Sequence, residues 1–189
     1  MFLTAKDIQK LCPTGTDTDL VSKPFYFTHE AWDKRMGFIE ANRFDITIES
    51  IWLADPEDGG GFLGEDSRQT PKLLPFPKYR ENEWILTQGF YHILAGEVLN
   101  MPNDVFGTVK ARRTIFGFSS FIVGTDIAPG YKGQIYCGMV VMAPKPFPVK
   151  RGARFASIRF ASVNAKGTIP YQGIWSGNKL STNGIERAF

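Results

Sequence analysis

Residues 101–134 read MPNDVFGTVKARRTIFGFSSFIVGTDIAPGYKGQ, and this stretch says more about the fold than any other part of the chain. A strand pattern ends on the basic residues Lys110, Arg112 and Arg113, and a segment punctuated by Gly and Pro follows between residues 124 and 133. Glycine and proline at this density mark tight turns between short strands. The stretch therefore predicts a strand with a basic end and, after it, a hairpin.

The same β pattern extends in both directions from this stretch. Residues 44–49 alternate between apolar and polar side chains, as a half-buried strand does, and the pattern continues toward Leu53. Further along, short strands alternate with turns at roughly ten-residue spacing, which favours a β sandwich or barrel. Short helices are expected at residues 5–11 and 29–36, and strands at residues 84–86, 90–95, 105–110, 120–123, 134–142 and 153–162.

Composition indicates a single globular domain. The chain has 189 residues, of which 43% are hydrophobic, enough for a real core. Its apolar runs are far shorter than the ~20 residues of a membrane span, and its first residues lack a signal-peptide region, so we expect a cytoplasmic protein. A net charge of +3 suits anionic ligands but is too mild for a nucleic-acid-binding surface. Residues 1–165 are expected to form the domain and residues 166–189 a tail.

The potential zinc ligands are few and scattered. The chain has two cysteines and two histidines, Cys12, Cys137, His29 and His92, and none has the spacing of a zinc site. The H-x-E and P-C-x-x-C signature of zinc-dependent deaminases is also absent. Any deamination by this chain would therefore have to proceed without zinc. We expect both cysteines to be reduced and buried.

Two segments are candidates for closing over a ligand. Residues 55–68 contain three consecutive glycines among acidic residues, so we expect a mobile surface loop that is either a solvated insertion or an active-site lid. Residues 166–189 are rich in Gly, Asn, Ser and Thr and carry Tyr171 and Trp175. This tail is either partly disordered or folds over a bound molecule.

Six segments, in the same order and with similar spacing, resemble the dCTP deaminase/dUTPase superfamily, and its dCTP deaminase branch more closely. They are residues 2–8, 43–48, 84–90, 97–104, 150–158 and 170–177. The resemblance implies an all-β fold, a distorted jelly-roll β barrel with short peripheral helices that assembles as a homotrimer. It also implies sites between subunits that bind a pyrimidine deoxynucleoside triphosphate, with Mg²⁺ bridging the phosphates and the tail folding over the ligand.

The resemblance also assigns binding residues. Arg112, Arg113 and Thr114 match the family's phosphate-binding motif, and guanidinium and hydroxyl groups are good donors to phosphate oxygens. The alternative for this run is a basic solvated loop. From the tail, Trp175 is expected to cover the nucleotide and Asn178 to bond its base or phosphate. The full set expected at the site is Arg112, Arg113, Thr114, Asp126, Ile127, Tyr131, Tyr171, Trp175 and Asn178.

The positions where the family carries its catalytic carboxylates hold other residues. Ala128 replaces the aspartate that contacts the sugar in deaminases and positions water in dUTPases, and Gly138 replaces the glutamate that activates water in deaminases. Neither side chain can accept a proton. The resemblance therefore identifies no catalytic residue. Asp126 is the remaining candidate for that role near the predicted hairpin. Glu97 and Asp104 are the other carboxylates to test.

Three functions follow from these observations. The first is an enzyme that deaminates dCTP or hydrolyses dUTP, as family membership would imply. The second is a non-catalytic relative that binds a nucleotide or a protein partner on the same trimeric barrel, as the loss of both carboxylates would imply. The third is a structural or assembly role for the trimer, because a fold alone does not determine function.

Overall fold

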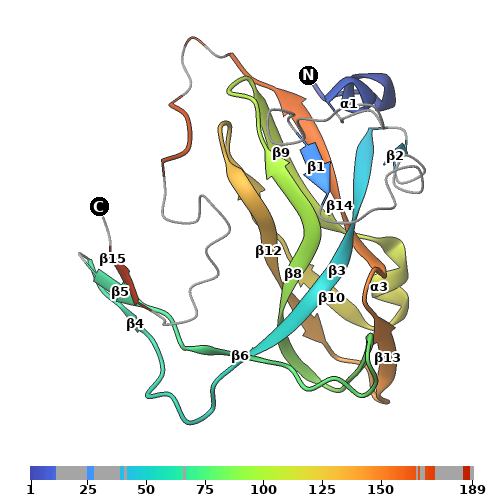
Figure 1. Ribbon diagram of the computed structural model, residues 1–189, viewed down its shortest axis with the longest axis vertical. Helices are drawn as coiled ribbons and strands as arrows, with labels where there is room; N and C mark the ends of the chain where they lie inside the picture. The colour runs from blue at the N-terminus through green and yellow to red at the C-terminus, as the bar shows by residue number, and fades with distance from the viewer. Residues whose placement is uncertain are drawn as a thin grey trace.

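The computed structural model describes residues 1–11, 25–27, 39–40, 42–65, 67–164, 166, 169–172 and 185–187. Strands dominate these residues and two short helices accompany them (Figure 1). The elements are α1 (Ala5–Leu11), β1 (Phe25–Phe27), β2 (Ile39–Glu40), β3 (Arg43–Ala54), β4 (Phe62–Leu63), β5 (Ser67–Gln69), β6 (Leu73–Pro75), β7 (Glu83–Leu86), β8 (Gly89–Asn100), β9 (Val105–Ala111), α3 (Arg113–Gly117), β10 (Ser120–Val123), β11 (Asp126–Ile127), β12 (Lys132–Val141), β13 (Phe147–Lys150), β14 (Arg154–Ser162) and β15 (Ile185–Arg187).

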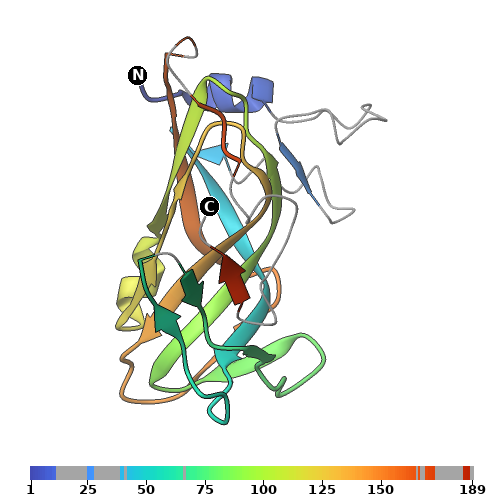
Figure 2. The same ribbon diagram turned by 90° about the vertical axis from the view of Figure 1, so that its left-hand side faces the viewer.

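Ten of these strands form one antiparallel sheet in the order β10-β12-β8-β3-β14-β9-β11, with β1 beside β8 and both β2 and β6 beside β3. The sheet curls around its own apolar face, as the two views at right angles show (Figures 1 and 2). Register shifts occur between Gln134 and Tyr136 and between Ile48 and Ser50. Such bulges bend a strand and increase its twist, which lets a sheet close on itself.

The core lies inside this curl. In β12, alternate side chains point inward, and Ile135, Cys137 and Met139 are at most 3% exposed. Phe44 and Ile46 of β3 and the aromatic residues of β14 complete the interior. The core is therefore built by period-two alternation, the pattern from which the sequence predicted strands. The all-β prediction is confirmed.

Most predicted elements are present, and several are longer than expected. Helix α1 has the predicted bounds, and Thr4 and Asp7 bond each other at its start, where the Thr4 hydroxyl donates to the carboxylate at 2.7 Å. Strand β8 continues to Asn100 because β12 pairs with it along most of its length. The helix predicted at residues 29–36 lies outside the described residues.

Two elements differ from the sequence-based expectation. Residues 113–117 form the short helix α3, which Ile115 anchors in the core, where the sequence predicted neither a helix nor a strand. Residues 147–150 form β13, although Pro144 to Pro148 predicted a turn. Strand β13 pairs only with β7, and its Phe147 stacks on Phe118 with ring centroids 4.6 Å apart. A two-stranded pairing leaves one edge open, which is where a strand tolerates proline.

The glycine-rich segment contains more regular structure than a loop. Residues 62–63 and 67–69 form the hairpin β4–β5, and β15 from the chain's last residues pairs with β5. The glycines at positions 59–61 themselves carry no strand. Figure 1 shows this small three-stranded sheet set apart from the main sheet. Mobility of residues 55–68 stays a prediction. No described helix is long and apolar enough to cross a membrane.

Candidate functional site

Arg112 lies at the end of β9, where the sequence placed it, but its guanidinium is bound to a carboxylate. Its Nη1 donates to Oδ2 of Asp45 on β3, and Nη1 of Arg154 lies 3.4 Å from the same oxygen. The Asp45 side chain is fully buried, and the Arg112 side chain is 20% exposed. Removing a charge from water requires such compensation. Arg112 is therefore in the first place a structural partner of Asp45.

Arg113 and Thr114 are exposed at the start of α3. In contrast to Arg112, neither makes an ion pair or a side-chain hydrogen bond with another described residue. They are thus the part of the predicted phosphate motif whose donors face solvent. A guanidinium and a hydroxyl so placed can bind phosphate oxygens.

The hairpin expected from the sequence is absent, because β11 pairs with β9, and β12 pairs with β8 and β10. The turn between these two strands is present: the Tyr131 amide donates to the carbonyl of Ala128, and Gly130 has a φ of 77°. This left-handed conformation is favourable for glycine, which has no Cβ. Strand β11 sets Asp126 opposite Thr108 of β9, with its side chain exposed, while Ile127 is buried in the core. Ile127 can therefore contact a ligand only through its backbone. Asp126 and Arg112 lie about 13 Å apart along these strands, judged from the rise per residue.

Tyr131 and Tyr171, both predicted binding residues, contact each other. Their rings are 5.6 Å apart in an edge-on arrangement, and the Tyr171 amide donates to the carbonyl of Pro129 at 2.8 Å. The Tyr131 hydroxyl donates to the carbonyl of Gln134 at 2.6 Å, and burial raises its pKa to about 12. The start of the tail therefore docks on the turn between β11 and β12. Trp175 and Asn178 lie outside the described residues.

Gly138 lies on the outward side of β12, and the ring of Phe90 lies against it. A Cβ added at Gly138 would be 2.5 Å from Cζ of Phe90 and 3.3 Å from Cβ of Val123. Any larger side chain at position 138 would first have to displace the Phe90 ring. The space where the family glutamate would extend is therefore occupied by an aromatic ring of this chain.

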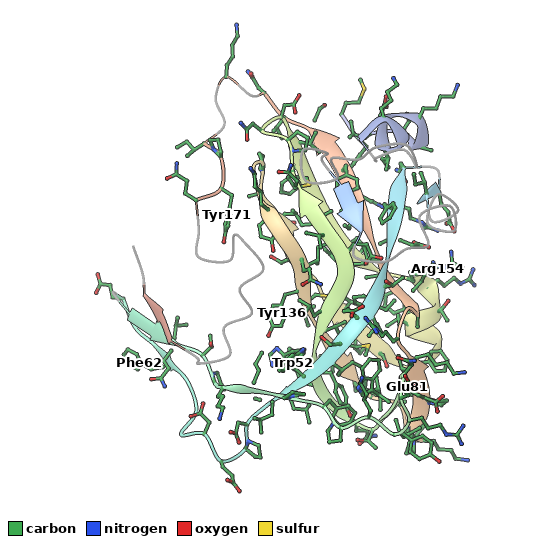
Figure 3. The ribbon with its side chains drawn as sticks, viewed as in Figure 1. Trp52, Phe62, Glu81, Tyr136, Arg154 and Tyr171 are labelled. Carbon is green, nitrogen blue, oxygen red and sulfur yellow. The ribbon has the colours of Figure 1, made fainter. Side chains whose placement is uncertain are left out.

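Further aromatic residues surround this position. His92 is directly opposite Gly138, Trp52 is opposite His92, and the His92 ring stacks on Tyr136 with centroids 5.5 Å apart. The Tyr136 hydroxyl bonds Nδ1 of His92, and burial lowers the pKa of His92, which favours its neutral form. Figure 3 shows Trp52 and Tyr136 on one side of the sheet and Arg154 on the α3 side. This cluster contains no carboxylate.

The other candidate carboxylates are not placed for catalysis. Glu97 is fully buried, and its two oxygens accept bonds from the amide and the hydroxyl of Thr47 at 2.8 and 2.9 Å. A carboxylate held in this way supports the sheet and has no access to solvent. Asp104 is exposed in the turn before β9. Within the described part of the chain, no group of three His, Cys, Asp or Glu side chains could hold a metal ion.

Sequence reasoning missed both the partners of Arg112 and the aromatic cluster. Asp45 occupies a polar position of the alternating strand β3, as an exposed residue would, and its partners come from distant segments. Phe90, His92 and Tyr136 follow the period-two pattern of outward side chains in β8 and β12. Aromatic residues at outward positions could have indicated a covered or binding face.

Comparison with known proteins places the chain in a family. Residues 54–163, more than half of the chain, match the profile described as dCTP deaminase-like. The chain belongs to the dCTP deaminase-like family. A probable deoxyuridine 5'-triphosphate nucleotidohydrolase of Methanosarcina mazei is 24% identical over 146 residues, 76% of this chain and 83% of the relative. A dCTP deaminase of Sulfurisphaera tokodaii is 34% identical over 106 residues, 55% of this chain and 57% of the relative.

A solved structure supports the fold of this dCTP deaminase-like chain. The 2'-deoxycytidine 5'-triphosphate deaminase from Agrobacterium tumefaciens superimposes with a TM-score of 0.60 and 15% sequence identity over 86% of this chain. The chain spans about half of that protein, 48% of its length. At this identity the similarity shows the fold alone. The predicted superfamily and its barrel are thereby confirmed.

Proposed function

We propose that this dCTP deaminase-like protein binds a pyrimidine deoxynucleoside triphosphate in the cytoplasm and does not deaminate it. The observation that carries the proposal is the contact between Phe90 and Gly138, since it fills the place of the water-activating glutamate with an apolar ring. Attack of water on a cytosine ring needs a base that takes a proton from the water. The aromatic cluster offers no carboxylate, and His92 is engaged with Tyr136.

The groups proposed to bind the nucleotide belong to two parts of the sheet. Arg113 and Thr114 follow β9 and would contact the phosphates, whereas Tyr131 directly precedes β12 and Gly138 belongs to it. In the sheet order, β8, β3 and β14 separate β12 from β9. We propose that the site is assembled between two subunits of a homotrimer, as the resemblance to the family implies.

A magnesium ion in this site would be held mainly by the ligand. The described residues contain no three-ligand cluster, and Mg²⁺ commonly binds through one or two carboxylates together with substrate phosphates and water. When bound with the triphosphate, Mg²⁺ would neutralise part of the phosphate charge. Arg113 and Thr114 would supply the remaining donors.

Hydrolysis of a dUTP-like ligand is a second candidate function, because Asp126 is exposed two residues before Ala128. Its carboxylate could orient a water molecule toward a phosphate. This activity differs from deamination in the residue that it needs. The substitution Asp126→Asn would abolish it while leaving binding through Arg113 intact.

The test is a titration of the purified protein with dCTP and with dUTP in the presence of Mg²⁺. Calorimetry measures binding, and chromatography of the same samples detects deaminated or hydrolysed products. We expect binding without dUTP formation from dCTP, and an affinity at least tenfold lower in Arg113→Ala, because a charge-assisted hydrogen bond contributes about 1.5–3 kcal/mol. Arg80→Ala removes an exposed guanidinium elsewhere and serves as the control.

Each result bears on the proposal. Formation of dUTP from dCTP by the wild-type protein would overturn it. Equal weakening in Arg113→Ala and Arg80→Ala would show that nucleotide binding is a general charge effect. Turnover of dUTP that disappears in Asp126→Asn would establish the second candidate function. If neither nucleotide binds, the result would favour the third function inferred from the sequence, a structural or assembly role for the trimer.

A further inference from the structure

Two guanidinium groups pair with one buried carboxylate on the α3 side of the sheet, and a third lies two residues away on the same strand. Asp45 accepts from Arg112 and Arg154, and Arg43, two residues before it on the same strand, pairs with Glu40 of β2. These charges come from β2, β3, the end of β9 and the start of β14. Arg43 and Arg154 remain 41% and 39% exposed, so the cluster reaches the surface.

Two polar atoms in this cluster are buried without a hydrogen-bond partner. They are Oδ1 of Asp45 and Nε of Arg43. A buried polar group that lacks a partner costs about 1–3 kcal/mol, so proteins seldom leave one unless another molecule satisfies it. Arg43 Nε is a donor, and its guanidinium uses only Nη2 in the pair with Glu40. The cluster thus contains an inward donor with no acceptor.

Electrostatics indicate that the cluster is short of negative charge. Burial lowers the pKa of Arg112, and the neighbouring guanidiniums of Arg154 and Arg43 lower it further, while Glu40 acts in the opposite direction. The pKa of Glu40 is lowered by its hydrogen bond with Arg43 and by the charges of Arg43, Arg112 and Arg154. The shift of Arg112 thus comes first from burial and then from repulsion by the neighbouring cations, whereas that of Glu40 comes from attraction to the same cations. An added anion would relieve that repulsion.

The register of the sheet extends the basic surface. Arg159 of β14 lies directly opposite Arg43, and Lys110 of β9 is in the same cross-strand row as Ser157 and Asp45. Directly opposed residues share one face of a sheet. Lys110 and Arg159 are exposed and pair with no described carboxylate. Asp126, at the end of the row that contains Arg159, is the one acidic residue that the register adds to this face.

We propose that Arg43, Arg112 and Arg154 form a binding site for a phosphate-type oxyanion, distinct from the nucleotide contacts at Arg113 and Thr114. Arg43 and Arg154 face the ligand from the surface, and Arg112 is the inner donor that Asp45 holds in place. Planar guanidinium groups bind tetrahedral oxyanions through paired N–H donors. The anion is either free phosphate or pyrophosphate, or a phosphate group carried by a nucleotide.

This site differs from the predicted phosphate motif in its residues and in its partners. Arg43 and Arg154 lie outside the motif and come from β3 and β14, far from it in sequence. Arg112 belongs to the motif, but its guanidinium points to Asp45 and to the other two arginines. Arg113, the next residue, is exposed and has no part in this network. The two sets of donors can therefore be tested separately.

The experiment is a calorimetric titration of the full chain with inorganic phosphate and with pyrophosphate, at constant ionic strength set with sodium chloride. We expect saturable binding by the wild-type protein. We expect Arg43→Gln and Arg154→Gln each to weaken it at least tenfold, since each removes a charged donor. Arg80→Gln removes one exposed positive charge from another part of the molecule and should change affinity less than twofold. Arg112 is not substituted, because its loss would leave the buried carboxylate of Asp45 without its partner and would destabilise the fold.

Additional variants keep the test decisive. Arg43→Lys retains the charge but loses the planar fork, so its affinity should fall between those of wild type and Arg43→Gln. Thermal unfolding of each variant, measured without phosphate, shows whether it is folded. Heat that never saturates in wild type, or equal weakening in Arg80→Gln, would overturn the site. Retention of wild-type affinity by a folded Arg154→Gln would also overturn it.

A parallel titration with dCTP distinguishes a free phosphate from a nucleotide-borne one. It also shows whether the proposed nucleotide binding fails independently of this site. If phosphate binds and dCTP does not, this site stands and the proposed function fails. If dCTP binds equally well to wild type and Arg154→Gln while phosphate does not bind, the proposed function stands and this site fails. Loss of both ligands in Arg154→Gln, with dCTP binding retained in Arg80→Gln, assigns the site to a nucleotide-borne phosphate.

Discussion

The ring of Phe90 on β8 lies against the backbone of Gly138 on β12, in the space that a side chain at position 138 would enter. Phe90 also contacts the edge of the His92 ring, with centroids 4.9 Å apart. Glycine at 138 and phenylalanine at 90 are therefore complementary. Because Phe90 is 46% exposed, its ring has room to turn toward solvent, at the expense of these contacts.

This complementarity predicts the cost of a methyl group at position 138. Gly138→Ala should lower the free energy of unfolding by about 1 kcal/mol, the lower end of what overpacking costs, because the Phe90 ring is displaced from His92. Chemical denaturation measures the change. In a Phe90→Ala background the same Gly138→Ala substitution should cost much less, since no ring has to move. Equal costs in both backgrounds would contradict the contact.

Restoring the carboxylate tests the absence of deamination at the same place. Gly138→Glu combined with Phe90→Ala provides both a base and the space for it. If deamination fails mainly because this glutamate is missing, the double variant should convert dCTP to dUTP measurably faster than Gly138→Glu alone. Chromatography of the nucleotides measures the rate. A faster reaction in the single variant would show that Phe90 does not obstruct the site.

The buried Asp45 predicts a large stability effect. Asp45→Asn removes the charge that compensates Arg112 and Arg154, and breaking a buried pair typically costs 3–5 kcal/mol, so we expect a loss of about 3 kcal/mol. Glu40→Gln is the matched control, because both members of the pair with Arg43 are 41% exposed and such a pair contributes less than about 1 kcal/mol. Similar losses in the two variants, measured in urea, would contradict the structural role of Asp45.

Cys137 provides a prediction for pH. Burial raises the pKa of its thiol to about 12, whereas an exposed thiol titrates near 9. Below pH 9 both the folded and the unfolded chain keep the proton, so stability does not depend on this group. Above pH 9 only the unfolded chain releases it, and stability should fall as pH rises toward 12. In a Cys12→Ser background, Cys137 should react with a thiol reagent at pH 8 only after denaturation. Rapid labelling of the native protein would contradict its burial.

The sequence predicted the longer strands because a sheet with one buried face produces alternation over parts of each strand, as in β9 and β12. Residues 120–123 were predicted with the bounds that the structure has. Helix α3 was missed, since one turn with a single buried residue, Ile115, leaves no helical period to detect. Strand β13 was missed because its prolines favour turns, and only its pairing with β7 overrides that preference.

The candidate site was predictable only in part. The sequence identified the positions of Ala128 and Gly138 and the exposed Arg113, which depend on local order along the chain. It could not show that Arg112 is bound by Asp45, because the two residues are 67 positions apart and meet through pairing with β14. It also could not show that Phe90 fills the space beside Gly138. Both contacts arise from the register between strands.

Tyr171 anchors the start of the tail to the turn between β11 and β12, and this contact predicts how the tail is released. The ring contact with Tyr131 should contribute about 0.5–1.5 kcal/mol beyond its buried area, whereas the backbone bond to Pro129 remains in any variant. Tyr171→Ala should therefore raise the population of the undocked tail about threefold to tenfold. Trypsin cleavage after Lys179, followed by mass spectrometry, measures that population when opening is fast compared with cleavage.

If the tail closes over a nucleotide, the rate of tryptic cleavage should also depend on dCTP. Saturating dCTP should slow cleavage of the wild-type tail, because an added ligand contact stabilises the docked state. In Tyr171→Ala the protection should be weaker at the same dCTP concentration, since part of the binding energy is used to dock the tail. Tyr79→Ala, at an exposed tyrosine of the loop before β7, should cleave like wild type. Faster cleavage in that control, or equal cleavage in all three proteins, would contradict the anchoring role of Tyr171.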